Sequence, residues 1–124
     1  MTATILLAAA LFMQVEAPAM IVEGTAGRID VAYAELSQGL NEQAIARIRS
    51  NRELDADDPA ALINLGTAHA RLGQADKAKA YFRAAISSRM PCDLQLADGR
   101  WIDSRRAARM ATAMLAQGGA LALR

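Results

Sequence analysis

The side chains of this sequence best suited to metal binding or acid–base chemistry are a single histidine, His69, and a single cysteine, Cys92. A zinc site needs three or four such ligands, so one histidine and one distant cysteine do not form a metal set. His69 falls at an inward position of a helical pattern and is interpreted as a core residue. Cys92 is interpreted as an unreactive thiol, with a redox or intermolecular role as the alternative. The sequence predicts no metal and no cofactor.

Two groups of like charges are the other candidates. Asp55, Asp57 and Asp58 resemble a cation site, but they also suit a solvated connection that ends at a helix N-terminus. The arginines near the C-terminus, Arg105, Arg106 and Arg109, suit an exposed helix face or an acidic partner. There is no phosphate-binding glycine loop, catalytic carboxylate pair or nucleophilic serine motif. We therefore expect no catalysis and no small-molecule substrate.

Composition limits the architecture. The 124 residues suffice for about one domain. Lys and Arg total 14 and Asp and Glu total 13, which argues against nucleic-acid binding because that function usually needs a basic patch. Alanine is abundant and aromatic residues make up 4%, which favours closely packed helices over a β-sandwich. One cysteine excludes an internal disulfide.

The N-terminus has the pattern of an export signal. Residues 5–13 are all apolar, and Ala17-Pro18-Ala19 supplies a small-x-small cleavage motif, although no Lys or Arg precedes the apolar run. The pattern predicts a signal peptide over 1–19, cleaved after Ala19, and a periplasmic product. Two alternatives are an uncleaved anchor in the inner membrane and a cytoplasmic helix that packs on the domain.

The chain matches itself at an offset of 34 residues, a period typical of helical-hairpin repeats. Identical pairs include one glycine pair and one isoleucine pair, which alanine abundance does not explain. The pairs are Ile29 and Ile63, Ala34 and Ala68, Gly39 and Gly73, Ala44 and Ala78, Ala46 and Ala80, and Arg49 and Arg83.

Each repeat is predicted to be a helix, a tight turn and a second helix, with helices near 28–38, 41–54, 59–72 and 75–88. Asp58 and Pro59 suit the start of the third helix, and Gly73 suits its end. Gly66 lies in the middle of that helix, where glycine costs about 1 kcal/mol relative to alanine. We expect a close approach of the paired helix there, with Ala78 as its small partner.

After Pro91 the pattern changes to a hairpin. Residues 93–103 alternate around Asp98-Gly99, a strong two-residue turn signal that would place Leu96 opposite Trp101. Trp101 is expected to pack in the core, or alternatively to bind a partner. A capping helix follows over about 104–117 and is ended by Gly118-Gly119, with Ile102, Ala107, Met110 and Met114 facing inward.

The second repeat closely resembles a tetratricopeptide repeat. The matching positions run in order through Asn64-Leu65-Gly66, the ring of His69, then Gly73, Ala78, Phe82, Ala85 and Pro91. The resemblance covers about residues 25–91, and the whole chain resembles small exported tetratricopeptide-repeat proteins of Gram-negative bacteria. It implies a mainly α fold: an N-terminal extension at 20–27, two helical hairpins at 28–91, the β-hairpin and capping helix at 92–118, and a tail at 119–124.

The resemblance also implies a function, namely binding of a peptide or helix of a partner protein in a concave groove. The implied groove residues are Ile29, Asp30, Tyr33, Ile63, Asn64, Thr67 and Ala70. The alternative is a structural role, in which the groove is filled by the chain's own segment Met-Ile-Val-Glu-Gly at 20–24 or by another copy, giving a homo-oligomer. A membrane-tethered scaffold is a further alternative, decided by whether the N-terminus is cut.

Overall fold

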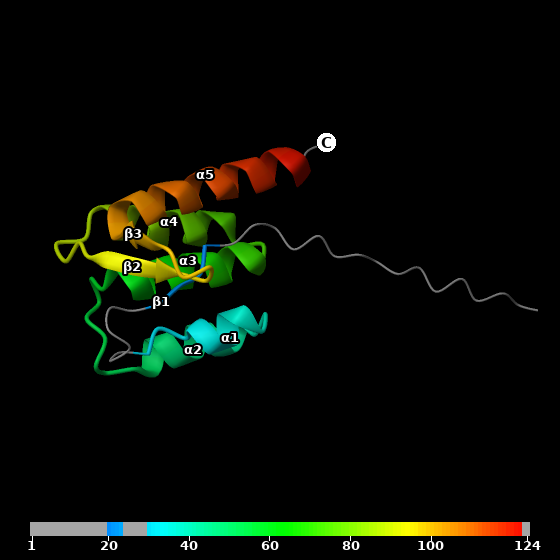
Figure 1. Cartoon of the computed structure of the whole chain (residues 1–124). Coiled ribbons are helices and arrows are strands. Elements are labelled where there is room, and N and C mark those ends of the chain that lie inside the picture. Colours follow the sequence, from blue (N-terminus) through cyan, green and yellow to red (C-terminus); the bar gives the residue numbers. More distant parts are fainter. Residues whose placement is uncertain (1–19, 24–29, 123–124) are drawn as a thin grey trace, which may run out of the picture.

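The protein is mainly helical, with a small antiparallel sheet on one side of the helices (Figure 1). The computed structural model describes residues 20–23 and 30–122. Over these residues the elements are β1 (Val22–Glu23), α1 (Tyr33–Ser37), α2 (Asn41–Ser50), α3 (Pro59–Arg71), α4 (Ala75–Ile86), β2 (Asp93–Leu96), β3 (Trp101–Asp103) and α5 (Ser104–Ala122). The predicted class, helices with a hairpin and a final helix towards the C-terminus, is confirmed. The predicted signal peptide lies outside the described residues.

The central pair of helices forms where its local signals predict. Asp58 caps α3, because its side chain accepts a hydrogen bond from the Ala61 backbone N–H at 2.9 Å, and Pro59 occupies the first turn. Gly73, at φ +76°, adopts the left-handed conformation that ends α3 and turns the chain into α4. These two helices pack closely side by side, and α3, which also contacts α1, α2, α5 and β1, lies at the centre of the molecule.

Gly66 lies at the contact between α3 and α4, as predicted, but its partner there is not Ala78. A Cβ atom built at Gly66 would lie 2.4 Å from Cε1 and 2.6 Å from Cδ1 of Phe82. The glycine therefore makes room for a buried aromatic ring. The three atoms nearest to that position all belong to Phe82, so the aromatic ring makes the closest approach in place of the predicted Ala78.

The first helical hairpin is shorter than predicted. Of the helix expected over 28–38, residues 28 and 29 lie outside the described residues, and within 30–38 the helix is α1, preceded by Ala32 in the left-handed conformation at φ 60°. The Asp30 carboxylate accepts a hydrogen bond from the Ala32 N–H at 2.8 Å, which favours a turn over a continued helix. The helix expected over 41–54 is α2, which ends at Ser50 because Asn51 is extended.

The strand β1 was not predicted. It comes from the expected N-terminal extension and pairs antiparallel with β2, giving the sheet order β1-β2-β3. In Figure 1 the sheet lies in front of α3, with α4 and α5 on one side and α1 and α2 on the other. As a result every residue of α3 from Pro59 to His69 is buried, whereas a single inward face was expected.

The hairpin between β2 and β3 is shifted by one residue from its predicted register. Gln95, not Leu96, lies opposite Trp101, and Leu96 donates its N–H to the Arg100 carbonyl at 2.8 Å. The loop thus has three residues, with Gly99 left-handed at φ +86°. Since side chains alternate across a strand, this shift moves Trp101 to the outer face, where it is 61% exposed. The expected core position of Trp101 was wrong.

Trp101 is the only tryptophan, so its fluorescence reports this register directly. We expect its emission maximum and its quenching by acrylamide to change little when the chain is unfolded in urea. Replacing Trp101 with alanine should change the free energy of unfolding by less than about 0.5 kcal/mol. A strong blue shift of the emission on folding would contradict the observed register.

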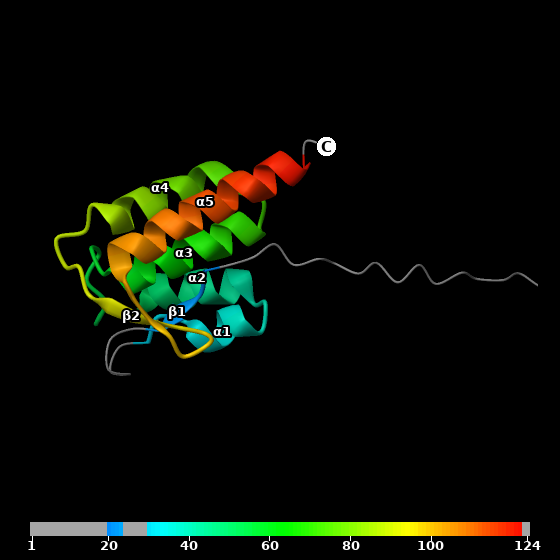
Figure 2. The same ribbon diagram turned by 45° about the horizontal axis from the view of Figure 1, so that its top comes forward.

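The last helix, α5, packs alongside α4 and α3 (Figure 2). Ala107 is buried as predicted, and Met110 and Met114 are partly buried against the core. The predicted end at Gly118-Gly119 was wrong, because α5 continues to Ala122. Glycine lowers helix stability by only about 1 kcal/mol per residue, and it ends a helix when it turns left-handed. The described glycines with positive φ are Gly39, Gly73 and Gly99.

Candidate functional site

Four of the seven predicted groove residues, Ile63, Asn64, Thr67 and Ala70, lie on one face of α3, which we call the α3 face. Three of them, Ile63, Asn64 and Thr67, are buried, and Ala70 is half-buried. The α3 face is therefore not an open groove. Residues 20–22 of the same chain cover it at Asn64 and Thr67, which corrects the expectation of a free concave surface along α3 and agrees with the alternative in which the chain's own segment fills the groove.

Asn64 holds the covering segment by its backbone. Its side-chain Oδ1 accepts from the Val22 N–H at 3.0 Å, and its Nδ2 donates to the Val22 carbonyl at 2.8 Å. The same Nδ2 donates to the Val31 carbonyl at 2.8 Å. One turn further along, the Thr67 hydroxyl donates to the Met20 carbonyl. The α3 face thus presents polar side chains that pair with the backbone of an extended chain.

The other side of the covering segment pairs with the sheet. Val22 lies opposite Leu96 and Glu23 opposite Gln95 in the antiparallel ladder with β2. Val22 has no exposed surface and Met20 is 5% exposed, whereas Glu23 is exposed. Because β1 is an edge strand, its outer backbone groups would need water. Asn64 satisfies them instead, which explains how this segment stays paired over only two strand residues.

The remaining predicted groove residues lie elsewhere. Asp30 is exposed and forms an ion pair with Arg47, with 2.5 Å between the closest nitrogen and oxygen. Tyr33 is half-buried in α1. Ile29 lies outside the described residues. Of the six predicted groove residues that the structure describes, it therefore brings together the four on α3, and Asp30 and Tyr33 lie apart from them.

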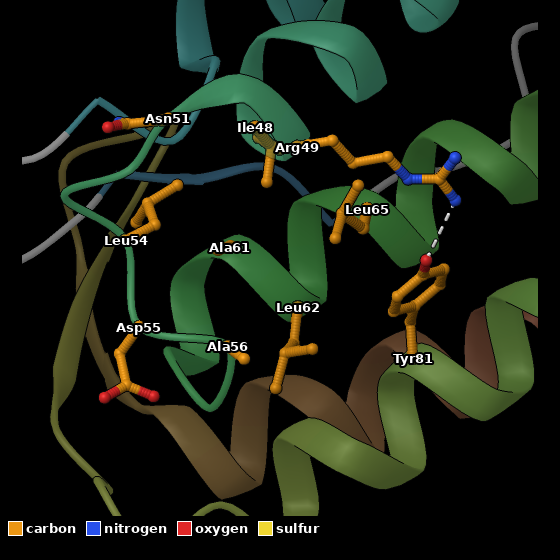
Figure 3. A pocket seen from close by; sticks show the side chains of 10 residues that line it. All are labelled: Ile48, Arg49, Asn51, Leu54, Asp55, Ala56, Ala61, Leu62, Leu65 and Tyr81. Atoms are coloured by element: carbon orange, nitrogen blue, oxygen red, sulfur yellow. Dashed lines mark hydrogen bonds between the residues drawn. The ribbon is translucent and has the colours of Figure 1, made fainter.

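A separate pocket, which we call the outer pocket, lies between α2, α3 and α4 (Figure 3). No pattern in the sequence predicted it. Its volume is about 320 Å³ and it is open to solvent. Apolar side chains form most of its surface, with Arg49 and Asp55 at different ends. It is lined by Ile48, Arg49, Asn51, Leu54, Asp55, Ala56, Ala61, Leu62, Leu65 and Tyr81.

Arg49 and Tyr81 close one end of this pocket. The Arg49 guanidinium donates to the Tyr81 hydroxyl at 3.1 Å, and the Tyr81 ring stacks on His69 with 5.3 Å between ring centroids. His69 is buried, and its Nδ1 lies 2.5 Å from the Gln74 Oε1. Among the described residues its Nε2 has no hydrogen-bond partner. This arrangement agrees with His69 as a packed core residue.

The acidic group at the start of α3 is used structurally. Asp58 caps α3, and the Asp57 carboxylate accepts from the Arg89 N–H at 2.8 Å while the Asp57 carbonyl accepts from the Ser88 hydroxyl at 2.6 Å. These bonds tie the start of α3 to the end of α4. Within residues 20–23 and 30–122, no group of three His, Cys, Asp or Glu side chains could hold a metal ion.

Cys92 is half-buried before β2. Burial raises the pKa of its thiol, and the negative charges of Asp58, Asp93 and Asp103 raise it further. A raised pKa leaves less thiolate at neutral pH, and the thiolate is the reactive form. We expect alkylation of Cys92 by iodoacetamide at pH 7 to be slower in the folded protein than in urea, with the folded rate still rising above pH 9. Equal rates in both states, measured by mass spectrometry, would contradict this assignment.

None of the helices in the described part of the chain is long and apolar enough to cross a membrane. Comparison with protein-family models, with curated proteins and with solved structures found no match.

Proposed function

We propose that this protein is a protein–protein interaction module of the tetratricopeptide type, which binds a segment of a partner polypeptide on the α3 face and catalyses no reaction. The supporting observation is that Asn64 and Thr67, predicted as groove residues from sequence, bind the backbone of an extended chain segment. Side chains that pair with both backbone groups of a bound residue are suited to polypeptide recognition.

In the isolated chain the α3 face is occupied by residues 20–22, so partner binding is coupled to their displacement. Because only a short segment has to move, the helices can stay in place during this exchange. We therefore expect modest affinity, since part of the binding free energy is spent on releasing the chain's own segment.

A second candidate is a structural role, in which residues 20–23 stay permanently in place and the protein acts as a self-associating or membrane-tethered scaffold subunit. The complete burial of Val22 and its pairing with β2 favour this candidate. The two candidates differ in whether the covering segment ever leaves the α3 face.

We also propose that the protein is exported to the periplasm and cleaved after Ala19, so that the mature chain begins at Met20. The alternative is an uncleaved segment that anchors the protein in the inner membrane. The intact mass of the protein purified from its native host separates these two, because cleavage removes residues 1–19.

Photo-crosslinking in the native host tests the interaction role. A photo-reactive phenylalanine analogue at Ala70, the half-buried residue of the α3 face, probes the proposed site, and the same analogue at Tyr81 probes the outer pocket as a matched control. We expect a partner crosslinked at Ala70 and not at Tyr81. Crosslinking at Tyr81 alone would move the binding site to the outer pocket, and none at either position would favour the structural role.

A further inference from the structure

The contacts of residues 20–23 define the kind of segment that the α3 face accepts. We infer, on the basis of the proposed function, that the partner supplies an extended segment with alternating apolar residues, which replaces residues 20–23 and pairs with β2. Met20–Glu23 then act as this chain's own copy of the ligand and as an autoinhibitory contact.

The ligand must be extended because it pairs with β2 as a neighbouring strand. Val22 and Glu23 pair with Leu96 and Gln95 in antiparallel register, and only a strand offers backbone groups along its length for such pairing. The opposite edge of the same segment is held by Asn64, which binds both the N–H and the carbonyl of Val22. A bound helix has already used these backbone groups internally.

Two positions of the ligand must be apolar. The side chains of Met20 and Val22 are buried, and these residues are two apart, so they lie on the same face of an extended chain. Ile21 is half-buried and Glu23 is exposed. The required pattern is therefore an apolar residue, a tolerant position and a second apolar residue.

The rest of the recognition does not depend on ligand sequence. Every hydrogen bond from the α3 face to the segment goes to a backbone atom, namely the Met20 carbonyl and the N–H and carbonyl of Val22. Strand addition of this kind takes its affinity from main-chain bonds and its specificity from alternate side chains. Another polypeptide with the same apolar pattern satisfies the same contacts.

Residues 20–23 compete with an added ligand for the α3 face and so lower its apparent affinity. A segment joined to its site by a short connection has an effective concentration of about 1 mM. A short peptide added to the intact chain must overcome this, so binding in trans should be weak until the connection is cut. A natural partner overcomes it with contacts outside the α3 face.

The test uses the full-length chain with a protease recognition sequence inserted between Glu23 and Asp30. The probe is a fluorescent peptide with the sequence of residues 19–24, Ala-Met-Ile-Val-Glu-Gly, followed by anisotropy. After cleavage we expect the peptide to bind at least about 100-fold more tightly than to the uncut chain, because the tether is lost.

Variant peptides test the pattern. Val22→Asp in the peptide places a charge where the side chain is fully buried and should weaken binding at least about 100-fold. Glu23→Gln is the matched control, because this side chain is exposed, and it should change binding less than about twofold. Equal binding of both variants would overturn the inference, as would equal binding to cut and uncut chains.

Circular dichroism of the cut protein covers the case in which the segment is needed for folding. If the helices unfold on release of the segment and the peptide restores them with the same dependence on Val22, the inference is supported. If the peptide does not restore them, or if the uncut chain forms dimers that Val22→Asp abolishes, the partner assignment is overturned.

The two proposals can fail separately. A partner crosslinked at Ala70 that lacks the apolar pattern and is not displaced by the peptide would leave the interaction role standing and overturn the ligand class. Peptide binding with the expected Val22 dependence, but without a cellular partner, would support the ligand class and count against the interaction role.

Discussion

Replacing Gly66 with alanine is expected to lower the free energy of unfolding by about 2 kcal/mol, the upper end of the overpacking cost less the gain in helix propensity. The new Cβ would lie 2.4 Å from Cε1 of Phe82, a buried side chain that is 2% exposed. Overpacking of this kind costs about 1–3 kcal/mol or more. It outweighs the gain of about 1 kcal/mol that alanine offers over glycine in a helix. Urea unfolding followed by circular dichroism measures the difference.

Two further variants show whether the Phe82 ring is the cause. Adding Phe82→Leu to Gly66→Ala should recover part of the loss, since the smaller side chain frees the volume that the new methyl group needs. Gly73→Ala is a control without crowding: no described atom lies within 4 Å of its Cβ position, but φ is +76°, so a loss of about 1–2 kcal/mol is expected. A neutral or stabilising Gly66→Ala would contradict the packing of α3 on α4.

Replacing Asn64 with leucine is expected to cost about 3 kcal/mol and to release β1. Leucine has a similar volume but removes three hydrogen bonds, to the N–H and carbonyl of Val22 and to the carbonyl of Val31. Each buried backbone group left without a partner costs about 1–3 kcal/mol. When residues 20–22 leave the α3 face, the N–H and carbonyl of Val22 return to water. This limits the total loss in the free energy of unfolding to about 3 kcal/mol.

Hydrogen exchange at the Val22 amide reports this release directly, and urea unfolding gives the global loss. We expect the Val22 amide to lose most of its protection in Asn64→Leu, while amides in the middle of α4 keep theirs. Asn51→Leu is the matched control, because the Asn51 side chain bonds the Asp30 carbonyl at the surface, and it should cost about 1 kcal/mol or less. Unchanged protection of Val22 in Asn64→Leu would refute the role of Asn64 in holding β1.

At the candidate site, the sequence predicted features that depend on residues close together in the chain and missed those that depend on contacts between distant segments. The resemblance to a tetratricopeptide repeat placed Asn64 and Thr67 among the predicted groove residues, and both lie on one face of α3. Filling of the groove by the chain's own segment at 20–24 was predicted only as an alternative, since no local signal ties a two-residue strand to a helix more than 40 residues away. The outer pocket escaped prediction for the same reason: Arg49 and Tyr81 meet only in the folded chain.

The amino-acid sequence by itself determined α3 and α4 and the turn between them, because Asp58, Pro59 and Gly73 act within a single helical turn. It also determined that a hairpin and a last helix follow. Only the tertiary structure decided which face of the hairpin holds Trp101, since a three-residue loop and a two-residue loop differ by one position and invert every side chain. It likewise decided that Phe82 faces Gly66 and that β1 covers Asn64, because these contacts join distant segments whose burial depends on the whole fold.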